Sequence, residues 1–346
     1  MTDFSFTSRR TQSGFTLVEL MISMVLGLIL IGGVYSVFTE NARTSQFVQA
    51  TSRTQENGRF ALSELVTRAR MIGYMGCLAA LDLTSGDFVN ALKTGTDNDY
   101  YFDLKAGQLE VIAFDSAAAS GAGNLTAPLK DDISPKTLTD VVIIRGLSSA
   151  DYNLAGAMPK TSADLKLIGE SEITKGDVLF LSDCQKAAVF QVDQTNVMGT
   201  TGKRNVVHNT SGNAPGNART SLSNGDSFAT DATVQLFTTT VFYIAQASFG
   251  TNSLGEDTFS LWQKNGTAPP FELVSGISDL EVWLGEDSSG DGVPDRIVRP
   301  SELSASNTKN VVSMDIRIRS DSIDPVGTDL IERDFFASVK FRNRGI

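Results

Sequence analysis

The stretch GFTLVELMISMVLGLILIGGVYSVF, residues 14–38, decides the fold of this chain. Its apolar part, Phe15 to Phe38, has 24 residues and a single charge, Glu19. At about 1.5 Å per residue, a helix of this length spans roughly 36 Å, enough to cross a bilayer core of ~30 Å. The buried helix of a soluble protein is the alternative, but core helices are rarely this long. We therefore predict a membrane-spanning helix over residues 15–38.

The residues before this run set its orientation. Arg9 and Arg10 stand against Asp3, and positive charge stays on the cytoplasmic side of a membrane. We therefore expect the N-terminus inside and residues beyond about 40 outside the inner membrane. A secretory signal would have an Ala-x-Ala-like site after its apolar core, and none follows here. Gly14, the small residue suited to cleavage, precedes the run, so cleavage there would leave the helix on the mature protein.

Glu19 is the candidate functional residue of the span. A carboxylate in the bilayer core costs several kcal/mol unless it has a partner. Cleavage after Gly14 would create an α-amino group on Phe15, four residues away, and such a group, with a pKa of about 8, is cationic at neutral pH. The amine that neutralises Glu19 could belong to the same chain or to a neighbouring subunit.

The motif GFTLVE, residues 14–19, resembles the class III signal of type IV prepilins. The resemblance implies that a prepilin peptidase cuts after Gly14 and that Phe15 becomes N-methylated. It also implies that Glu19 pairs with the N-terminus of a neighbouring subunit during assembly. Pilins, minor pilins and type II secretion pseudopilins share this signal, so the motif alone leaves all three open.

Further stretches resemble the PilW-type minor pilins. They are QENGRFAL at 55–62, RMIGYMGC at 70–77, residues 176–192, Tyr243 followed by FSLW at 259–262, and RNR at 342–344. The resemblance implies a minor pilin that assembles into or primes a type IV pilus, near its tip, with other minor pilins and the major pilin as partners. It places the body first in the periplasm and then on the pilus at the cell surface.

The apolar helix should continue beyond the membrane as an amphipathic half, residues 39–76. Between Thr39 and Ile72 there is no proline and one glycine, Gly58, and Gly73 and Gly76 would end the helix. Apolar residues recur with helical spacing along it: Leu62, Leu65, Val66, Ala69 and Ile72.

Residues 77–346 form the expected globular body. Short apolar runs between turn residues predict nine strands: 109–114, 141–144, 178–181, 187–192, 234–245, 258–262, 280–284, 311–319 and 335–342. The fold class is therefore α+β, pilin-like, with a long N-terminal helix packed on a mainly antiparallel β body. Segments 115–127 and 199–231 are rich in small polar residues and are expected to be mobile loops.

The charge balance limits the partners of the body. The net charge is −11, and the leader 1–14 contributes +1, so the mature chain is near −12. General nucleic-acid binding needs a basic surface, so we do not expect it here.

Two cysteines, Cys77 and Cys184, favour a structural disulfide, because an exterior body lies in an oxidising compartment and neither residue has a CxxC partner. Closing a loop of this size stabilises a fold by ~4–5 kcal/mol in the chain-entropy picture. Two unpaired thiols are the alternative.

The sequence DSSGDGVPD, residues 287–295, resembles a calcium-binding loop of the EF-hand type. It departs from that pattern by a serine at the third position and by Val298 where a bidentate glutamate is usual. We predict a Ca²⁺ site, with a solvated turn as the alternative. The oxygens would come from Asp287, Ser289, Asp291, the Val293 carbonyl and Asp295.

The sequence gives little indication of an enzyme active site. His208 is the only histidine, which excludes multi-histidine zinc sites, and we expect it to be an exposed loop residue. The favoured interpretation is a structural minor pilin and not an enzyme. Alternatives are a type II secretion pseudopilin of the J type, a pilus-tip adhesin or DNA-uptake module carried by the same helix, and, more remotely, an anchored periplasmic enzyme.

Overall fold

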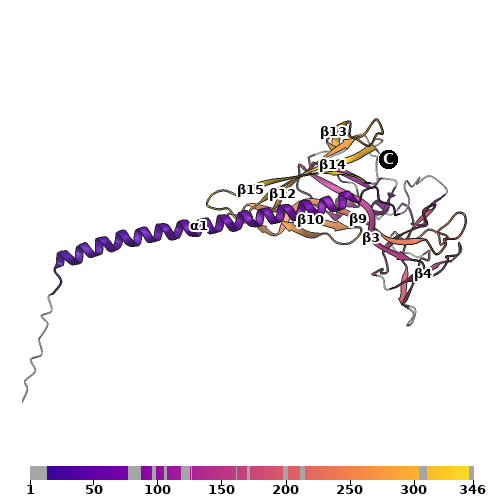
Figure 1. Cartoon of the computed structure of the whole chain (residues 1–346), viewed down its shortest axis with the longest axis horizontal. Coiled ribbons are helices and arrows are strands. Elements are labelled where there is room, and N and C mark those ends of the chain that lie inside the picture. The colour runs from indigo at the N-terminus through magenta and orange to yellow at the C-terminus, as the bar shows by residue number, and fades with distance from the viewer. Residues whose placement is uncertain are drawn as a thin grey trace, which may run out of the picture.

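The molecule is a long helix with a β-rich body folded around its second half (Figure 1). The computed structural model describes residues 14–76, 87–95, 99–104, 107–117, 125, 127–160, 162–169, 172–197, 202–210, 215–303 and 310–342. The first half of the helix projects from the body as a bare rod. The expected α+β architecture is confirmed.

Helix α1 (Leu17–Arg70) is one uninterrupted element of 54 residues. At about 1.5 Å per residue it is roughly 80 Å long. Its fully buried residues all lie in the second half, with Thr54 the first of them. The helix ends at Met71 as its C-cap, and Gly73, at φ 88°, adopts the left-handed backbone conformation that favours glycine. The transition from exposed to buried surface occurs within the helix, without a break.

The buried face of α1 differs slightly from the predicted stripe. Leu65 and Ala69 are buried as expected, but Leu62 and Val66 are only partly buried. The face is centred instead on positions spaced three or four apart: Thr54, Gly58, Ala61, Leu65 and Ala69.

Gly58 is a point of close approach between α1 and the body. A Cβ atom built at Gly58 would lie 2.2 Å from Phe335 Cε2, inside van der Waals contact. Phe335 packs against the same core as the buried face of the helix. Glycine is required here because the ring occupies the space that any side chain would need.

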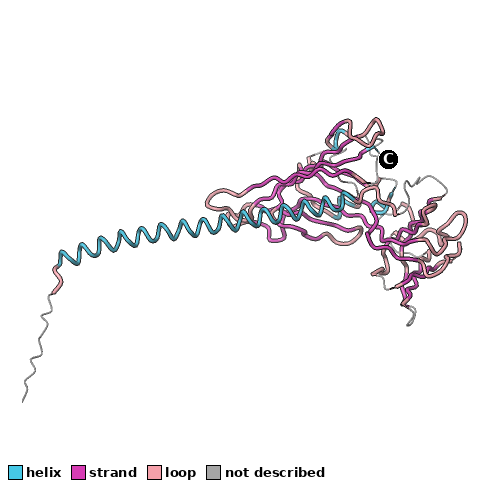
Figure 2. The backbone as a smooth tube through the Cα atoms, viewed as in Figure 1, coloured by secondary structure: helices cyan, strands magenta, loops and turns pink. Residues whose placement is uncertain are grey.

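The described residues of the body form three sheets, and Figure 2 traces their strands in magenta. The largest has eight strands, with the path β1-β6-β5-β9-β10-β11 and with β3 joining β2 to β9. The others have the orders β13-β12-β14-β15 and β4-β8-β7, and every pairing is antiparallel except that of β1 with β6. The strands are β1 (Phe88–Asn90), β2 (Leu109–Phe114), β3 (Thr139–Asn153), β4 (Asp164–Ile168), β5 (Val178–Ser182), β6 (Ala187–Gln191), β7 (Gln194–Val197), β8 (Lys203–Val207), β9 (Thr233–Thr251), β10 (Asp257–Asn265), β11 (Phe271–Ser275), β12 (Ile277–Glu286), β13 (Arg296–Val298), β14 (Val311–Asp321) and β15 (Glu332–Lys340); short helices are α2 (Asp99–Phe102), α3 (Leu129–Asp132) and the 3-10 helix η2 (Pro300–Glu302).

One hydrophobic core joins the helix to two of these sheets. Leu65 of α1, Val142 and Phe242 of the eight-stranded sheet, and Val282 and Ile316 of the β13-β12-β14-β15 sheet belong to the same buried cluster. The helix packs chiefly on β14, β15 and β11. The four-stranded sheet therefore has one face on the core and the other toward solvent.

All nine predicted strands are present, although most are longer than predicted. Strands β1, β4, β7, β8, β11 and β13 were missed because each has only three to five residues. The loop predicted over 199–231 is wrong in part, since β8 lies within it. Residues 198–201 and 211–214 lie outside the described residues, as do 118–124 and 126 of the loop predicted at 115–127.

Replacing Gly58 with alanine should destabilise the body even though alanine is the better helix former by about 1 kcal/mol. Overpacking a close contact costs ~1–3 kcal/mol, so the thermal unfolding midpoint of the full chain in detergent should fall. Gly33→Ala is the matched control, because nothing lies within 4 Å of a Cβ at Gly33. Phe335→Leu should partly rescue Gly58→Ala. A Gly58→Ala variant as stable as the wild type contradicts the contact.

Candidate functional site

The first turn of α1 is closed by a reciprocal hydrogen-bond arrangement between Thr16 and Glu19. The backbone N–H of Glu19 donates to Thr16 Oγ1 at 3.3 Å, and the backbone N–H of Thr16 donates to Glu19 Oε2 at 3.0 Å. The Thr16 hydroxyl also donates to Glu19 Oε2, at 3.0 Å. This is a capping box, which satisfies amide donors that a helix start leaves free.

The cap adds a second role for Glu19 that the sequence interpretation missed. The signal was visible as Thr-x-x-Glu at residues 16–19, the usual pattern of a capping box. The carboxylate is turned back toward the start of the helix, where Phe15 lies 82% exposed. A carboxylate held there is available to an amine at the N-terminus of this chain or of another one.

The apolar half of α1 has no covering within the described chain. One helix is long and apolar enough to span a membrane, and none of its most apolar window is buried. Leu28, Ile29, Leu30 and Ile31 are each exposed by about two thirds of their surface. Exposed apolar surface of this extent requires lipid or other helices around it.

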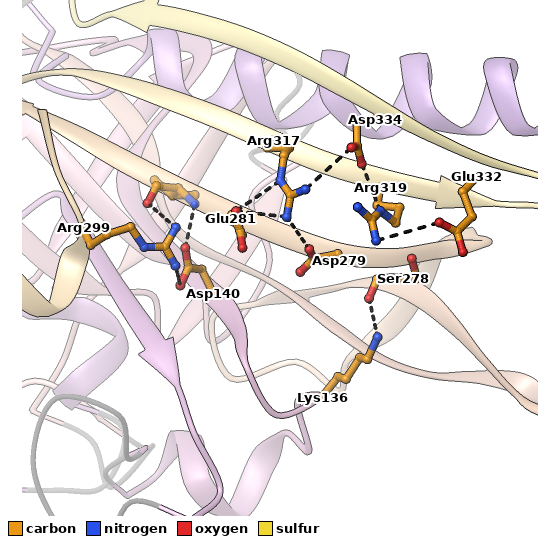
Figure 3. A network of polar contacts seen from close by, with 11 residues as sticks. Lys136, Asp140, Ser278, Asp279, Glu281, Arg299, Arg317, Arg319, Glu332 and Asp334 are labelled. Atoms are coloured by element: carbon orange, nitrogen blue, oxygen red, sulfur yellow. Dashed lines mark hydrogen bonds and ion pairs between the residues drawn. The ribbon is translucent and has the colours of Figure 1, made fainter.

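Charged side chains form a ladder across the solvent face of the four-stranded sheet (Figure 3). Arg317 of β14 bonds Asp279 Oδ2 at 2.7 Å and Glu281 Oε2 at 3.1 Å, both on β12. On the other side it pairs with Asp334 of β15 at 3.6 Å, and Arg319 donates to Asp334 Oδ1 at 3.0 Å. The ladder ties three neighbouring strands together at their outward positions.

A buried ion pair links the two large sheets. Asp140 of β3 is 1% exposed, and its Oδ2 accepts the Val282 amide of β12 at 2.6 Å. Arg299, which follows β13, donates to Asp140 Oδ1 at 3.2 Å and to the Val282 carbonyl at 3.2 Å. Burial raises the pKa of Asp140 to about 6, against the lowering effect of Arg299. The pair fixes the relative position of the sheets that enclose the core.

The proposed calcium ligands do not point to a common centre. Asp287 accepts the amides of Gly290 at 2.6 Å and Gly292 at 2.7 Å, and Asp295 accepts the amide and hydroxyl of Ser288, both at 2.7 Å. Burial acts to raise the pKa of Asp287, but the loop amides hold that pKa below its ordinary value.

Asp291 accepts only the Val293 amide, at 2.8 Å, and Ser289 donates to Asp287. Within the described ranges, no three His, Cys, Asp or Glu side chains gather in a cluster suited to a metal ion. The loop closes on its own amides, and calcium binding stays a prediction.

Of the two cysteines, Cys184 is described and Cys77 lies outside the described residues. Cys184 has a φ of 67°, between β5 and β6, and is not a free thiol. Gly76 lies next to Ser182, because a Cβ at Gly76 would be 3.4 Å from Ser182 Oγ. The chain before Cys77 thus runs close to the strand before Cys184, which favours their pairing; the disulfide itself stays a prediction.

The expectation of an exposed His208 was wrong. Its side chain is fully buried, and its ring centroid lies 5.0 Å from that of Phe190. Burial lowers the pKa of His208 to about 4, so the ring is neutral at neutral pH. The missed signal is β8, whose Val206 is a core residue two positions before His208.

Two family models match this chain. The prokaryotic N-terminal methylation motif matches residues 9–35, and the Type IV Pilus-assembly protein W model matches residues 241–331. No curated protein matches, and no solved structure matches. The first match covers Gly14, Phe15 and Glu19, and the second runs from the middle of β9 to the residue before β15.

The prepilin-type N-terminus on a bare apolar helix, together with the PilW match over the second half of β9 and over β10 to β14, supports a PilW-type, pilin-like protein of type IV pilus assembly.

Proposed function

We propose that this protein is a minor pilin, cleaved between Gly14 and Phe15 by a prepilin peptidase, that enters or primes a type IV pilus. The observation that carries the proposal is the division of α1. Its apolar half is bare, with Glu19 at its start, whereas burial by its own body begins at Thr54. Such a helix lies in the inner membrane first and can then exchange lipid for the helices of other subunits, without unfolding the body.

Glu19 provides the electrostatic step of this assembly. Among helices packed away from water, a carboxylate without a counter-charge is costly, so a subunit whose amine reaches Glu19 is held at one register. The capping box keeps the carboxylate oriented toward the helix start before a partner arrives. The tip or priming position and a periplasmic body follow from the resemblance to PilW-type minor pilins.

A pseudopilin of type II secretion would carry the same N-terminal motif, but the sequence of the body favours a pilus protein. The match over residues 241–331 is to a pilus-assembly protein. A structural role in assembly, and not catalysis, is the function that both matches favour.

Glu19→Ala and Glu19→Gln separate the two roles of this side chain. Glutamine retains the acceptor of a capping box but removes the charge. If the ion pair drives assembly, both variants should enter sheared pili at least about tenfold less than wild type, which corresponds to ~1.4 kcal/mol. Ser23→Ala, which removes only the hydrogen bond from Ser23 Oγ to the Glu19 carbonyl, should enter normally. Normal entry of Glu19→Gln would leave only the capping role.

Gly14→Val tests the processing step. A Cβ at Gly14 has nothing within 4 Å, so the substitution disturbs no contact of the fold and reports on the peptidase alone. The variant should remain at full-length mass in the membrane fraction, by intact-mass spectrometry. Gly27→Ala, also without neighbours within 4 Å, should be processed. A mature mass for Gly14→Val would remove the cleavage proposal.

We also propose that the 287–295 loop binds Ca²⁺ by turning its carboxylates from the loop amides to the ion. Millimolar Ca²⁺ should then raise the unfolding temperature of the full chain in detergent, and Mg²⁺, which prefers a more rigid octahedral shell, should not. Asp291→Asn should abolish the shift, because Asp291 bonds only Val293 in the loop. An unchanged unfolding temperature counts against the site.

A further inference from the structure

A hollow lies on the solvent face of the β13-β12-β14-β15 sheet, and the proposed function assigns it no role. It measures about 440 Å³. Side chains from four different strands stand around it: Trp283 of β12, Ile297 of β13, Asp315 of β14 and Phe336 of β15. We call these four residues the aromatic hollow.

The apolar walls of the aromatic hollow are exposed to solvent. Phe336 is 67% exposed and Ile297 60% exposed, while Trp283 is half-buried. Strand alternation explains their direction, because neighbouring residues such as Val282 and Ile316 point into the core. A cluster of large apolar side chains on a solvent face marks an interaction surface.

Asp315 is the charged residue that lines the hollow. It lies directly between Trp283 and Ser338 in the strand register, and its carboxylate makes no ion pair or hydrogen bond with any residue in the described ranges. The next outward residues of β14, Arg317 and Arg319, are both bonded to carboxylates of the ladder. Asp315 is therefore an outward charge of this strand that has no ion pair among the described residues.

The walls around this carboxylate suit a cation. A guanidinium or ammonium group is attracted to the face of an aromatic ring and, at short range, to a carboxylate. The molecule already uses this chemistry beside the hollow, where the Arg299 guanidinium lies 5.1 Å from the Trp283 ring centroid. That guanidinium is committed to Asp140, so it does not neutralise Asp315.

No basic residue in the described part of the sheet supplies the missing charge. Arg296 pairs with Glu286, and Arg317 and Arg319 belong to the ladder. Lys340, on the same side of β15, makes no ion pair with Asp315. A cation bound in the hollow would therefore come from another molecule, and the net charge of −11 favours a basic surface on that partner.

We propose that the aromatic hollow receives an arginine or lysine side chain presented by another pilus subunit. The inference rests on the proposed function, because it takes the neighbour to be a pilin. The aromatic rings and Ile297 desolvate the ion pair, and Asp315 selects the charge. Contacts of this kind, an anchor side chain in an apolar-walled pocket, dominate the stability of protein interfaces.

The test uses photo-crosslinking in piliated cells that produce the full chain. A benzophenone amino acid replaces Ile297 at the rim of the hollow, leaving Asp315 and Phe336 intact. Ile168 on β4, 57% exposed and in another sheet, is the matched control site. We expect an adduct between position 297 and a pilus subunit, mapped by mass spectrometry next to an arginine or lysine.

Substitutions in the hollow then test its chemistry. Asp315→Asn and Phe336→Ala should each lower the adduct at position 297 at least about tenfold, and leave any adduct at position 168 unchanged. Asp315→Lys should abolish the adduct, and changing the mapped basic residue to glutamate should restore it. The isosteric Asp315→Asn variant is measured for its unfolding temperature, so that a loss of fold is not mistaken for a loss of contact.

Three results would overturn the inference: no adduct at position 297, an adduct with lipid or DNA only, or an adduct that Asp315→Asn does not change. The failure of the proposed function looks different. In that case Glu19→Ala leaves pilus incorporation normal and the adduct forms with a protein outside the pilus. Loss of incorporation in Glu19→Ala without an adduct at position 297 removes only the inference about the hollow.

Discussion

The contact between α1 and the four-stranded sheet is the constraint on which the rest of the structure depends. At Gly58 the helix backbone comes so close to Phe335 that no side chain fits between them, and the buried face continues through Leu65 and Ala69. This contact lies within the part of the helix that the body covers, where the buried residues begin at Thr54. It also fixes which face of the sheet is covered, and so which face is left to solvent. Because the helix is continuous, the position of Glu19 relative to the body is set by the same contact.

The body must therefore hold its shape around a helix that it covers only in part. A single core containing residues of α1 and of both large sheets does this by hydrophobic burial. The pair Asp140–Arg299 adds a polar link between those sheets at the Val282 backbone. A buried pair of this kind contributes little net stability but is costly to break, so it favours one arrangement of the sheets over others. A rigid body is what allows a helix to transmit a defined register to a neighbour.

Much of the fold could be predicted from local pattern. The span, the single long helix and nine strands follow from apolar runs and their period, which depend only on near neighbours in the sequence. The short strands could not be predicted, because three to five residues carry little pattern and because some, such as β4 and β8, are joined to each other from distant parts of the chain. His208 shows the same limit: its small polar neighbours indicate a loop, and only the tertiary contact with Phe190 makes it a core residue. The roles of Gly14, Phe15 and Glu19 could be inferred because the motif is contiguous, whereas the aromatic hollow draws one residue from each of four strands.

On the solvent face of the four-stranded sheet, charged side chains occur in two different surroundings. Around Arg317 and Arg319, the carboxylates of Asp279, Glu281, Asp334 and Glu332 each pair with an arginine on a neighbouring strand, so these charges are compensated within the molecule. Around Asp315 the neighbours are aromatic and aliphatic, which leaves the charge uncompensated beside exposed apolar surface. Both the desolvation of those rings and the neutralisation of that carboxylate are satisfied by one partner side chain with an apolar stem and a cationic head. The bare helix and this face thus present the same physical condition at two places in the molecule, since each has exposed apolar surface beside an acidic group, Glu19 or Asp315.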